Sequence, residues 1–164
     1  MLWVIRESMI VIGIDPGLAR LGYGVLRGDR GSVVPVCYGC LETRARTRSG
    51  ERLLEIYTGL ASLFDRYPPD GIAVEKLFFS KNVTSAMGVS EVRGIVLLAA
   101  EQRGIPVFEY TPNQVKQAVT GSGRADKVQV QQMITRLLRL SEVPQPDDAA
   151  DALSIALCHI HVMR

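Results

Sequence analysis

DDAADALSIALCHIHV, residues 147–162, combines an acidic start with a long apolar run near the end of the chain. Pro146 followed by two acids is typical of a helix start, and no Gly or Pro interrupts the run, so we predict a helix that begins near Pro146 or Asp147. Asp148 and Asp151 then share one helix face, with Cβ atoms roughly 5–6 Å apart. The helix should pack on a sheet through an apolar stripe made of Leu153, Ala156, Leu157 and Ile160.

Two earlier acids stand where apolar strands end. Asp15 closes MIVIGID, residues 9–15, and Glu75 lies near the end of GIAVEK, residues 71–76. Acids in a first helical turn complement the helix dipole, which accounts for Asp147 but leaves Asp15 and Glu75 unexplained. If the two strands are neighbours and the last helix packs beside them, one spot collects the four acids Asp15, Glu75, Asp148 and Asp151.

The order of elements predicts a mixed α/β sheet. The chain opens with three strands that form an antiparallel meander, at residues 9–15, about 22–27 and about 32–42. Helices and strands then alternate: a helix around Leu53–Phe64, a strand at 71–76, a helix at about 84–103, a strand at 105–110, a helix after Thr111-Pro112, a helix at about 126–140 and the terminal helix. We therefore expect a central five-stranded mixed sheet, its first three strands antiparallel, with helices on both faces.

Length and composition fit one globular domain. The chain has 164 residues, 47% of them hydrophobic, so we expect a single domain over residues 9–164 preceded by a short extension, residues 1–8. The run MIVIGI is too short to span a membrane and no signal peptide is evident, so we expect a cytoplasmic protein without a membrane association. A net charge of +2 does not by itself indicate a nucleic-acid binder, but setting the four acids aside leaves a basic surface that suits a polyanion.

Cysteine and histidine offer no strong alternative site. Three cysteines in a cytosolic chain indicate reduced thiols. Cys37 and Cys40 form a C-x-x-C, but residues three apart in a strand face opposite sides of the sheet, which argues against a zinc or redox role. His159 and His161 do not face each other on a helix and are interpreted as ordinary helix residues.

The four acids predict a site for divalent metal ions. Hard oxygen ligands without nearby His or Cys favour Mg²⁺ or Mn²⁺ over zinc. Four crowded carboxylates repel one another, and two divalent ions roughly 3.5–4 Å apart would relieve that repulsion. Such a pair suits in-line attack on a phosphodiester, with one ion activating water and the other stabilising the leaving oxygen. We therefore expect Mg²⁺ as the cofactor, two ions per subunit, with Mn²⁺ able to substitute.

Four segments carry a family resemblance: VIGIDPGLARLGYGV (11–25), VEKLFFSKNVTSAM (74–87), TPNQVKQAVTGSGRADK (111–127) and DDAADALSIALCHIH (147–161). In this order they closely resemble the RuvC family of Holliday-junction resolvases, whose fold is ribonuclease H-like. The resemblance spans nearly the whole chain from Met9 onward. It implies a catalytic, metal-binding quartet of Asp15, Glu75, Asp148 and Asp151.

The same resemblance implies what the protein does and with which partners. A family member is a homodimer that binds a four-way DNA junction and makes paired symmetric nicks, one per subunit, in strands of like polarity. That reaction serves homologous recombination and DNA repair, and the RuvA–RuvB branch-migration complex is the implied partner. The helix at about 84–103 is apolar on more than one face, so we hypothesise that dimerisation occurs through it.

The DNA-binding residues expected from the resemblance are Phe78, Lys81, Lys116, Arg124 and Lys127. Phe78 matches an aromatic that stacks on bases opened at the crossover, and Lys116 and Lys127 match lysines near the scissile phosphate. For an isolated residue, a core Phe or a solvated lysine is the simpler interpretation. Ser122 departs from the family wording, in which a lysine often stands at that place, and either Arg124 compensates or backbone contact there is weaker. A further group that could contact phosphates comprises Arg44, Arg46, Arg48 and Arg52.

Three rival functions stay open at this point. DPGLARLGYG, residues 15–24, also resembles the phosphate loop of the actin and sugar-kinase superfamily, but that class needs a second subdomain, for which this chain has no room. A module that binds junction DNA without cutting it is a second alternative, although all four acids are present. A ribonuclease H-like nuclease acting on RNA is the third, and the lysine and aromatic motifs favour the junction instead.

Overall fold

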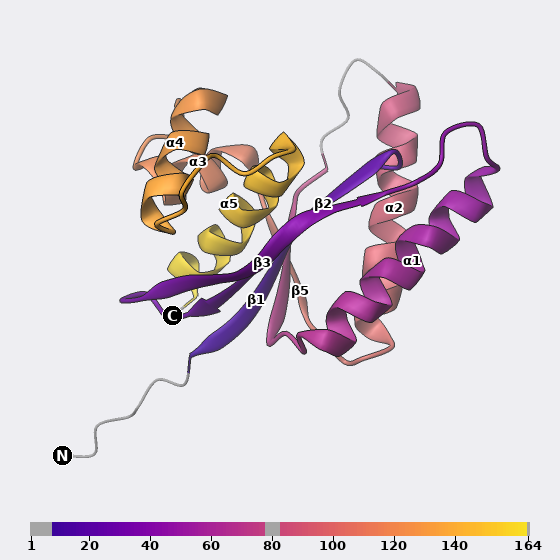
Figure 1. Ribbon diagram of the computed structural model, residues 1–164, viewed down its shortest axis with the longest axis horizontal. Coiled ribbons are helices and arrows are strands. Elements are labelled where there is room, and N and C mark those ends of the chain that lie inside the picture. The colour runs from indigo at the N-terminus through magenta and orange to yellow at the C-terminus, as the bar shows by residue number, and fades with distance from the viewer. Residues whose placement is uncertain (1–7, 78–82, 164) are drawn as a thin grey trace.

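The computed structural model describes residues 8–77 and 83–163, which form a five-stranded sheet between two layers of helices (Figure 1). The strands are β1 (Met9–Asp15), β2 (Arg20–Gly28), β3 (Val33–Glu42), β4 (Gly71–Glu75) and β5 (Val107–Tyr110). Their order across the sheet is β3-β2-β1-β4-β5. β1, β2 and β3 pair antiparallel, whereas β4 runs parallel to both β1 and β5. The predicted mixed sheet with an antiparallel opening is confirmed.

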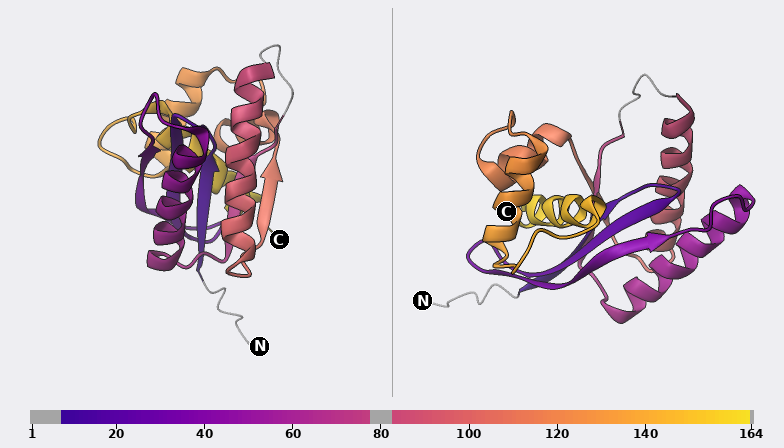
Figure 2. Two further views of the ribbon diagram at one scale, coloured as in Figure 1. Left: turned by 90° about the vertical axis from the view of Figure 1, so that its right-hand side faces the viewer. Right: turned by 45° about the horizontal axis from the view of Figure 1, so that its top comes forward.

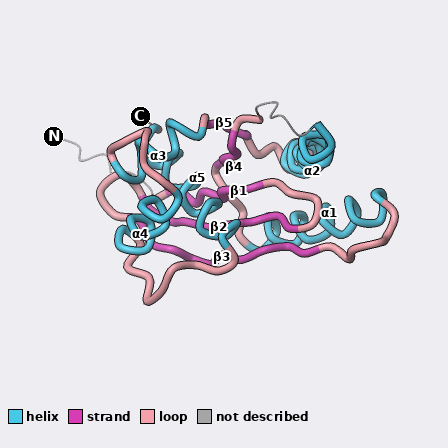
Figure 3. The backbone as a smooth tube through the Cα atoms, turned by 90° about the horizontal axis from the view of Figure 1, so that it is seen from above, coloured by secondary structure: helices cyan, strands magenta, loops and turns pink. Residues whose placement is uncertain are grey.

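The two helical layers cover opposite faces of this sheet (Figure 2). α1 (Ser49–Arg66) and α2 (Val83–Glu101) lie on one face. The other face carries α5 (Asp147–Val162), against which α3 (Pro112–Thr120) and α4 (Lys127–Leu137) pack. Seen from above in Figure 3, the strands separate the α1–α2 layer from the α3–α4–α5 layer. The expected helices are all present, although α4 ends at Leu137 rather than near residue 140.

β1 is apolar throughout because both of its faces are covered. Its successive side chains point to opposite sides of the sheet. Ile12 and Ile14 belong to the core under α1 and α2, while Val11 belongs to the core around α5. A strand buried on both faces has no polar position until it ends. Asp15 lies on the same face of β1 as Val11 and Gly13, and therefore points to the α5 side of the sheet.

α5 is the central element of its layer. All residues from Ala149 to Ile160 are buried except Asp151. The predicted one-sided stripe was too narrow, because α3 and α4 cover the side of the helix that the sheet leaves open. His159 is a buried core residue rather than the ordinary helix residue expected: its Nδ1 lies 2.6 Å from the Tyr110 hydroxyl, and its ring centroid lies 4.4 Å from that of Phe108.

Two glycines allow α5 to lie directly on the strands. A Cβ atom at Gly13 of β1 would stand 2.0 Å from the carbonyl oxygen of Ala152, and one at Gly22 of β2 would stand 2.1 Å from the carbonyl oxygen of Asp148. No side chain fits at such a distance, so both positions need glycine while α5 keeps its place. These close approaches set the depth of the helix, and with it the height of its acids above the sheet.

α2 keeps a large apolar surface outside the core. Val92 and Val96 are buried in the α1–α2 layer, whereas Met87 is 61% exposed and Leu98 is 50% exposed. By length and composition alone, with 19 residues and a mean hydropathy of 1.4, α2 could cross a membrane. The sequence analysis, which considered only residues 9–14 as a span, missed this property. Within the described residues, the contacts of α2 with α1 and with the sheet core account for one of its faces and leave the other uncovered.

Candidate active site

Asp15 and Glu75 meet because their strands are parallel neighbours. β1 and β4 pair in a register that sets Ile14 opposite Val74, so the next residue on each strand is an acid. Carboxyl ends of adjacent parallel strands lie at the same edge of a sheet. The adjacency that the sequence analysis required for convergence is thus present, and both acids stand at one edge.

α5 adds two further acids from its first turns. Its helix begins at Asp147, as predicted, and Asp148 and Asp151 follow on a common face. Because Gly13 and Gly22 seat the helix on β1 and β2, this face is held next to the end of β1. After burial, the charges of Asp151 and Asp148 raise the pKa of Asp15, and a side-chain hydrogen bond with Asp148 adds to this rise.

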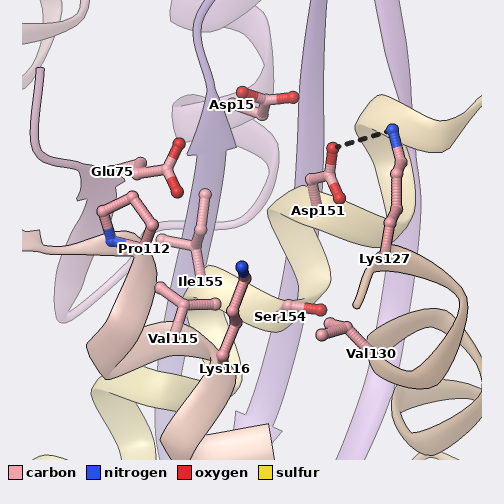
Figure 4. A pocket seen from close by; sticks show the side chains of 10 residues that line it. All are labelled: Asp15, Glu75, Pro112, Val115, Lys116, Lys127, Val130, Asp151, Ser154 and Ile155. Atoms are coloured by element: carbon pink, nitrogen blue, oxygen red, sulfur yellow. Dashed lines mark ion pairs between the residues drawn. The ribbon is translucent and has the colours of Figure 1, made fainter. Parts of the chain in front are cut away.

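Three of the four acids line a single cavity of about 230 Å³ (Figure 4). Asp15, Glu75 and Asp151 surround its upper part, and Lys116 and Lys127 enter it from α3 and α4. The remaining lining is mostly apolar and comprises Pro112, Val115, Val130, Ser154 and Ile155. The cavity is therefore an acidic recess with two cations at its side.

The cavity holds more negative charge than its lysines compensate. Burial, followed by the charges of Asp151, Asp148 and Glu75, raises the pKa of Asp15 to about 8. Burial likewise raises the pKa of Glu75, which Asp151 raises further and Lys116 lowers. Burial also raises the pKa of Asp151, against the opposing effect of Lys127. A cation placed among these groups would favour their ionised forms.

Capping boxes determine where the two lysine-bearing helices begin. The Thr111 hydroxyl accepts the Gln114 backbone N–H at 3.2 Å, and the Gln114 side chain accepts the Thr111 N–H at 2.8 Å. Asp126 and Gln129 repeat this reciprocal pair at the start of α4. Each box holds the first turn of its helix in place. Lys127, the first residue of α4, is thereby positioned at the cavity.

Lys127 connects two acids of α5. Its Nζ lies 2.9 Å from Oδ2 of Asp147 and 3.9 Å from Oδ2 of Asp151. The hydrogen bond to Asp147 is the main cause of the raised pKa of Lys127, which stays a cation. Asp147, attributed to the helix dipole from sequence, is instead the ion-pair partner that holds this lysine beside the cavity.

Asp148 is directed toward an arginine that the sequence analysis did not single out. Nη1 of Arg20 lies 3.4 Å from Oδ2 of Asp148, and its Nε lies 3.2 Å from Oε1 of Glu42. Arg20 opens β2 and Glu42 closes β3, opposite each other in the sheet. The cross-strand pairing of Arg20 with Glu42 depends on strand register, so residue spacing alone carries no signal for it. Asp148 itself does not line the cavity.

The described acids fit a hard divalent cation without forming a ready-made cluster. Within residues 8–77 and 83–163, no three His, Cys, Asp or Glu side chains come close enough together for a preassembled metal site. The carboxylates stand around the cavity instead, as repelling groups do. The charged oxygen donors of the cavity are all carboxylates, no His or Cys among the described residues lines it, and burial raises the pKa of each of its three acids. That donor set suits Mg²⁺ or Mn²⁺.

The remaining sequence-predicted DNA contacts lie away from the acids or outside the described residues. Arg124 is exposed on the loop between α3 and α4 and lines a neighbouring hollow. Phe78 and Lys81 fall outside the described part of the chain. Of the arginine group before α1, Arg48 pairs with Glu51 at 2.6 Å. Lys116 and Lys127 are thus the two predicted DNA contacts that the fold brings to the acids.

The strand order, with acids at the carboxyl ends of two parallel neighbours and on a helix that crosses them, defines a protein of the ribonuclease H-like nuclease class. The chain belongs to the RuvC family: the family model described as crossover junction endodeoxyribonuclease RuvC matches residues 11–159. The RuvC of Desulfitobacterium hafniense is 53% identical over 153 residues, 93% of each chain. The RuvC of Pseudothermotoga lettingae is 54% identical over 154 residues, 94% of this chain and 95% of that one.

A solved structure supports the same assignment at the level of the fold. The structure of T. thermophilus RuvC in complex with a Holliday junction substrate superposes with a TM-score of 0.88 at 38% identity. The match covers 92% of each chain. The sequence-based expectation of the family and of a ribonuclease H-like fold is therefore confirmed.

Proposed function

We propose that this chain is a structure-selective endonuclease that resolves four-way DNA junctions by paired symmetric nicks. The observation that carries the proposal is the cavity in which Asp15, Glu75 and Asp151 stand beside Lys116 and Lys127. Membership of the RuvC family supplies the substrate, since a similar fold is known in complex with a junction. We retain the single nuclease domain over residues 9–164, the extension 1–8 and a cytoplasmic place of action as part of this proposal.

The acids would hold the metal cofactor of the reaction. Asp15, Glu75, Asp148 and Asp151 are the proposed ligands, for two Mg²⁺ per subunit or Mn²⁺ in their place. When bound, such ions supply a water activated for attack and a counter-charge for the leaving oxygen. The apolar residues of the cavity lining, among them Val115, Val130 and Ile155, reduce the contact of its charged groups with solvent. Charges in a partly dry site interact more strongly than charges in water.

The two lysines would position the phosphate to be cut. Lys116 projects from α3 toward the acids, and Lys127 is held at the start of α4 by its pair with Asp147 (Figure 4). Fixed cations beside a reacting phosphate stabilise the negative charge that develops in the transition state. Burial and the charge of Asp151 raise the pKa of Glu75, and the positive charge of Lys116 opposes that rise.

Further DNA contacts complete the proposal. Phe78 would stack on bases opened at the crossover, and Lys81 and Arg124 would contact the backbone. Phosphate contacts determine orientation on the DNA, whereas cleavage depends on the acids, so binding and cleavage should separate on mutation. A nuclease that cuts RNA would act on a different substrate, and a module that only binds DNA would bind junctions without cutting them. A panel of substrates distinguishes these alternatives.

We also propose a homodimer that assembles through α2, with the RuvA–RuvB complex as a partner of the dimer. The support from the fold is the uncovered apolar surface of α2, which includes Val83, Met87, Leu97 and Leu98. An exposed apolar patch of this kind marks an interaction surface. A dimer would place two acid cavities on one junction, as paired nicks require. Sedimentation that shows a monomer at micromolar concentration would contradict the dimer.

A substrate panel tests the proposed function. End-labelled four-way junctions with a mobile core, linear duplex of the same sequence and an RNA–DNA hybrid are incubated with the protein in Mg²⁺ and in EDTA. Paired nicks in the junction alone, absent in EDTA, are expected. Equal cutting of junction and duplex would indicate a general nuclease, and cutting of the hybrid alone would indicate an RNA-directed one. Tight junction binding without any nick would indicate a binding module.

A further inference from the structure

A second hollow lies on the far side of α4 from the acid cavity. It has a volume of about 430 Å³ and is formed by the α3–α4 loop and the outer face of α4. We call it the Arg136 hollow. Its polar lining comprises Thr120, Ser122, Arg124, Gln129, Gln132 and Arg136. The sequence analysis considered Ser122 and Arg124 among these residues, and Arg136 has no assigned role.

The lining of the Arg136 hollow suits a phosphate group. Its described residues offer two guanidinium groups, the Ser122 hydroxyl and two side-chain amides, and no carboxylate, whereas the Thr120 hydroxyl donates to the carbonyl oxygens of Lys116 and Ser122. Neither Arg124 nor Arg136 has an acid within ion-pair distance in the described part of the chain. The nearest acid in sequence, Asp126, is engaged as the cap of α4, where it accepts the Gln129 N–H at 2.8 Å. The two arginines are therefore free to bind an anion in a planar, bidentate manner.

α4 separates this hollow from the acid cavity. At 100° per residue, Arg136 lies half a turn round the helix from Lys127, and Gln129 and Gln132 share its side. Lys127 and Val130 line the acid cavity, while the glutamines and Arg136 line the hollow. Nine residues of helix rise by roughly 13 Å. The two sites also lie on opposite sides of a helix about 10–12 Å wide, so a phosphate in the hollow would lie roughly 15–20 Å from one at the acids, a separation of about three to four nucleotides along a strand.

We propose that the Arg136 hollow binds a backbone phosphate of a junction arm, about three to four nucleotides from the phosphate that is cut. This inference rests on the proposed function and extends it to a second contact on the same subunit. A contact of this type carries no base readout but sets the orientation of the arm relative to the acid cavity. α4 then lies between two phosphate contacts, with Lys127 on one side and Arg136 on the other.

The salt dependence of junction binding tests the inference. Affinity for a fluorescent synthetic four-way junction is measured in EDTA, where no cutting occurs, across a series of salt concentrations. Each phosphate contact contributes about 0.9 to the slope of log affinity against log salt. Arg136→Gln should make the slope shallower by about 0.9 per subunit and weaken binding equally for junctions of different sequence. Arg27→Gln, an exposed arginine on β2 beside the start of β1, is the charge-matched control and should leave the slope unchanged.

A modified substrate locates the contact. Replacing single phosphates by neutral methylphosphonates along one arm should weaken wild-type binding at a position about three to four nucleotides from the nick. The Arg136→Gln protein should be insensitive at that position and sensitive elsewhere, because the two changes remove the same interaction. An unaltered salt slope in Arg136→Gln, or equal sensitivity of both proteins at every position, would overturn the inference. Failure of the wild-type protein to bind junctions would overturn the proposed function instead.

Discussion

Replacing Asp15 by Asn should stabilise the metal-free protein while abolishing cleavage. The pKa of Asp15 is raised from 3.8 to about 8, first by burial and then by the charges of Asp151, Asp148 and Glu75. The folded protein therefore holds a proton that the unfolded chain releases, so the free energy of unfolding falls as pH rises from about 4 to about 8. Asn is close in shape and carries no charge, so the variant should lack this loss.

The size of the effect follows from the shift. At 1.36 kcal/mol per pKa unit, a carboxyl with an unfolded pKa of 3.8 and a folded pKa of about 8 costs at most roughly 4 kcal/mol at pH 7. The amide loses some of the hydrogen bonding of a protonated carboxyl, so a net gain of about 1–3 kcal/mol is expected. For a domain of this length, that gain corresponds to a melting temperature higher by roughly 3–10 °C.

Thermal or urea unfolding in EDTA at pH 4 and pH 8 measures this gain. Asp15→Asn should exceed wild type at pH 8 and differ from it much less at pH 4, where the folded carboxyl is protonated and the unfolded one is only partly ionised. Added Mg²⁺ should raise the stability of wild type more than that of the variant, since only wild type keeps all four acids. Asp147→Asn is the matched control: its exposed carboxylate pairs with Lys127, which lowers its pKa, so the variant should lose a little stability. An Asp15→Asn protein less stable than wild type in EDTA at pH 8 would refute the reasoning.

Three other perturbations test separate parts of the structure. Gly13→Ala should destabilise the fold by about 1–3 kcal/mol in urea unfolding, because its Cβ would stand 2.0 Å from the Ala152 carbonyl oxygen. The control Gly50→Ala, on α1 with open space around it, should cost nothing. Equal effects of the two substitutions would contradict the close packing of α5 on β1. Burial lowers the pKa of His159 in the folded protein, so as pH falls the unfolded chain binds a proton before the folded protein does, and wild type should lose stability below about pH 6.5. His159→Gln should lose less stability than wild type between pH 7 and pH 5. Equal losses in the two proteins would show that another group titrates. Lys116→Met should reduce single-turnover cleavage of a junction by about 10²-fold at saturating protein with little change in binding, while a loss of binding alone would limit Lys116 to a backbone contact.

The sequence predicted the elements and their acids well. Asp15 and Glu75 end short apolar strands, and the Pro146 signal marks the start of α5 within one residue of its observed place. Thr111 and Asp126 cap helices where their residue types indicate. These features are local, since each depends on residues within a few positions of one another. Local patterns therefore sufficed for the positions of the acids along the chain.

Contacts between distant segments could not be read in the same way. The adjacency of β1 and β4 had to be assumed, because strand order is set by packing over the whole sheet. The burial of α5 on all sides depends on α3 and α4, which an amphipathic pattern in α5 alone cannot reveal. The pairing of Arg20 with Asp148 joins residues 128 positions apart. Tertiary packing, rather than any feature of residues 147–162, brings Asp148 within reach of Arg20.

The most direct test of the central claim compares cleavage and binding in variants of the acid cavity. Nicking of a mobile-core junction is measured in Mg²⁺, and binding of the same junction in EDTA, for wild type, for the control Glu55→Gln, an exposed acid of α1 on the other side of the sheet from the cavity, and for the variants Asp15→Asn, Glu75→Gln, Asp148→Asn and Asp151→Asn. The account predicts that the four site variants lose nicking by at least about 10²-fold, bind within a few-fold of wild type, and that the control nicks normally. Nicking at the wild-type rate by any of the four site variants would contradict it.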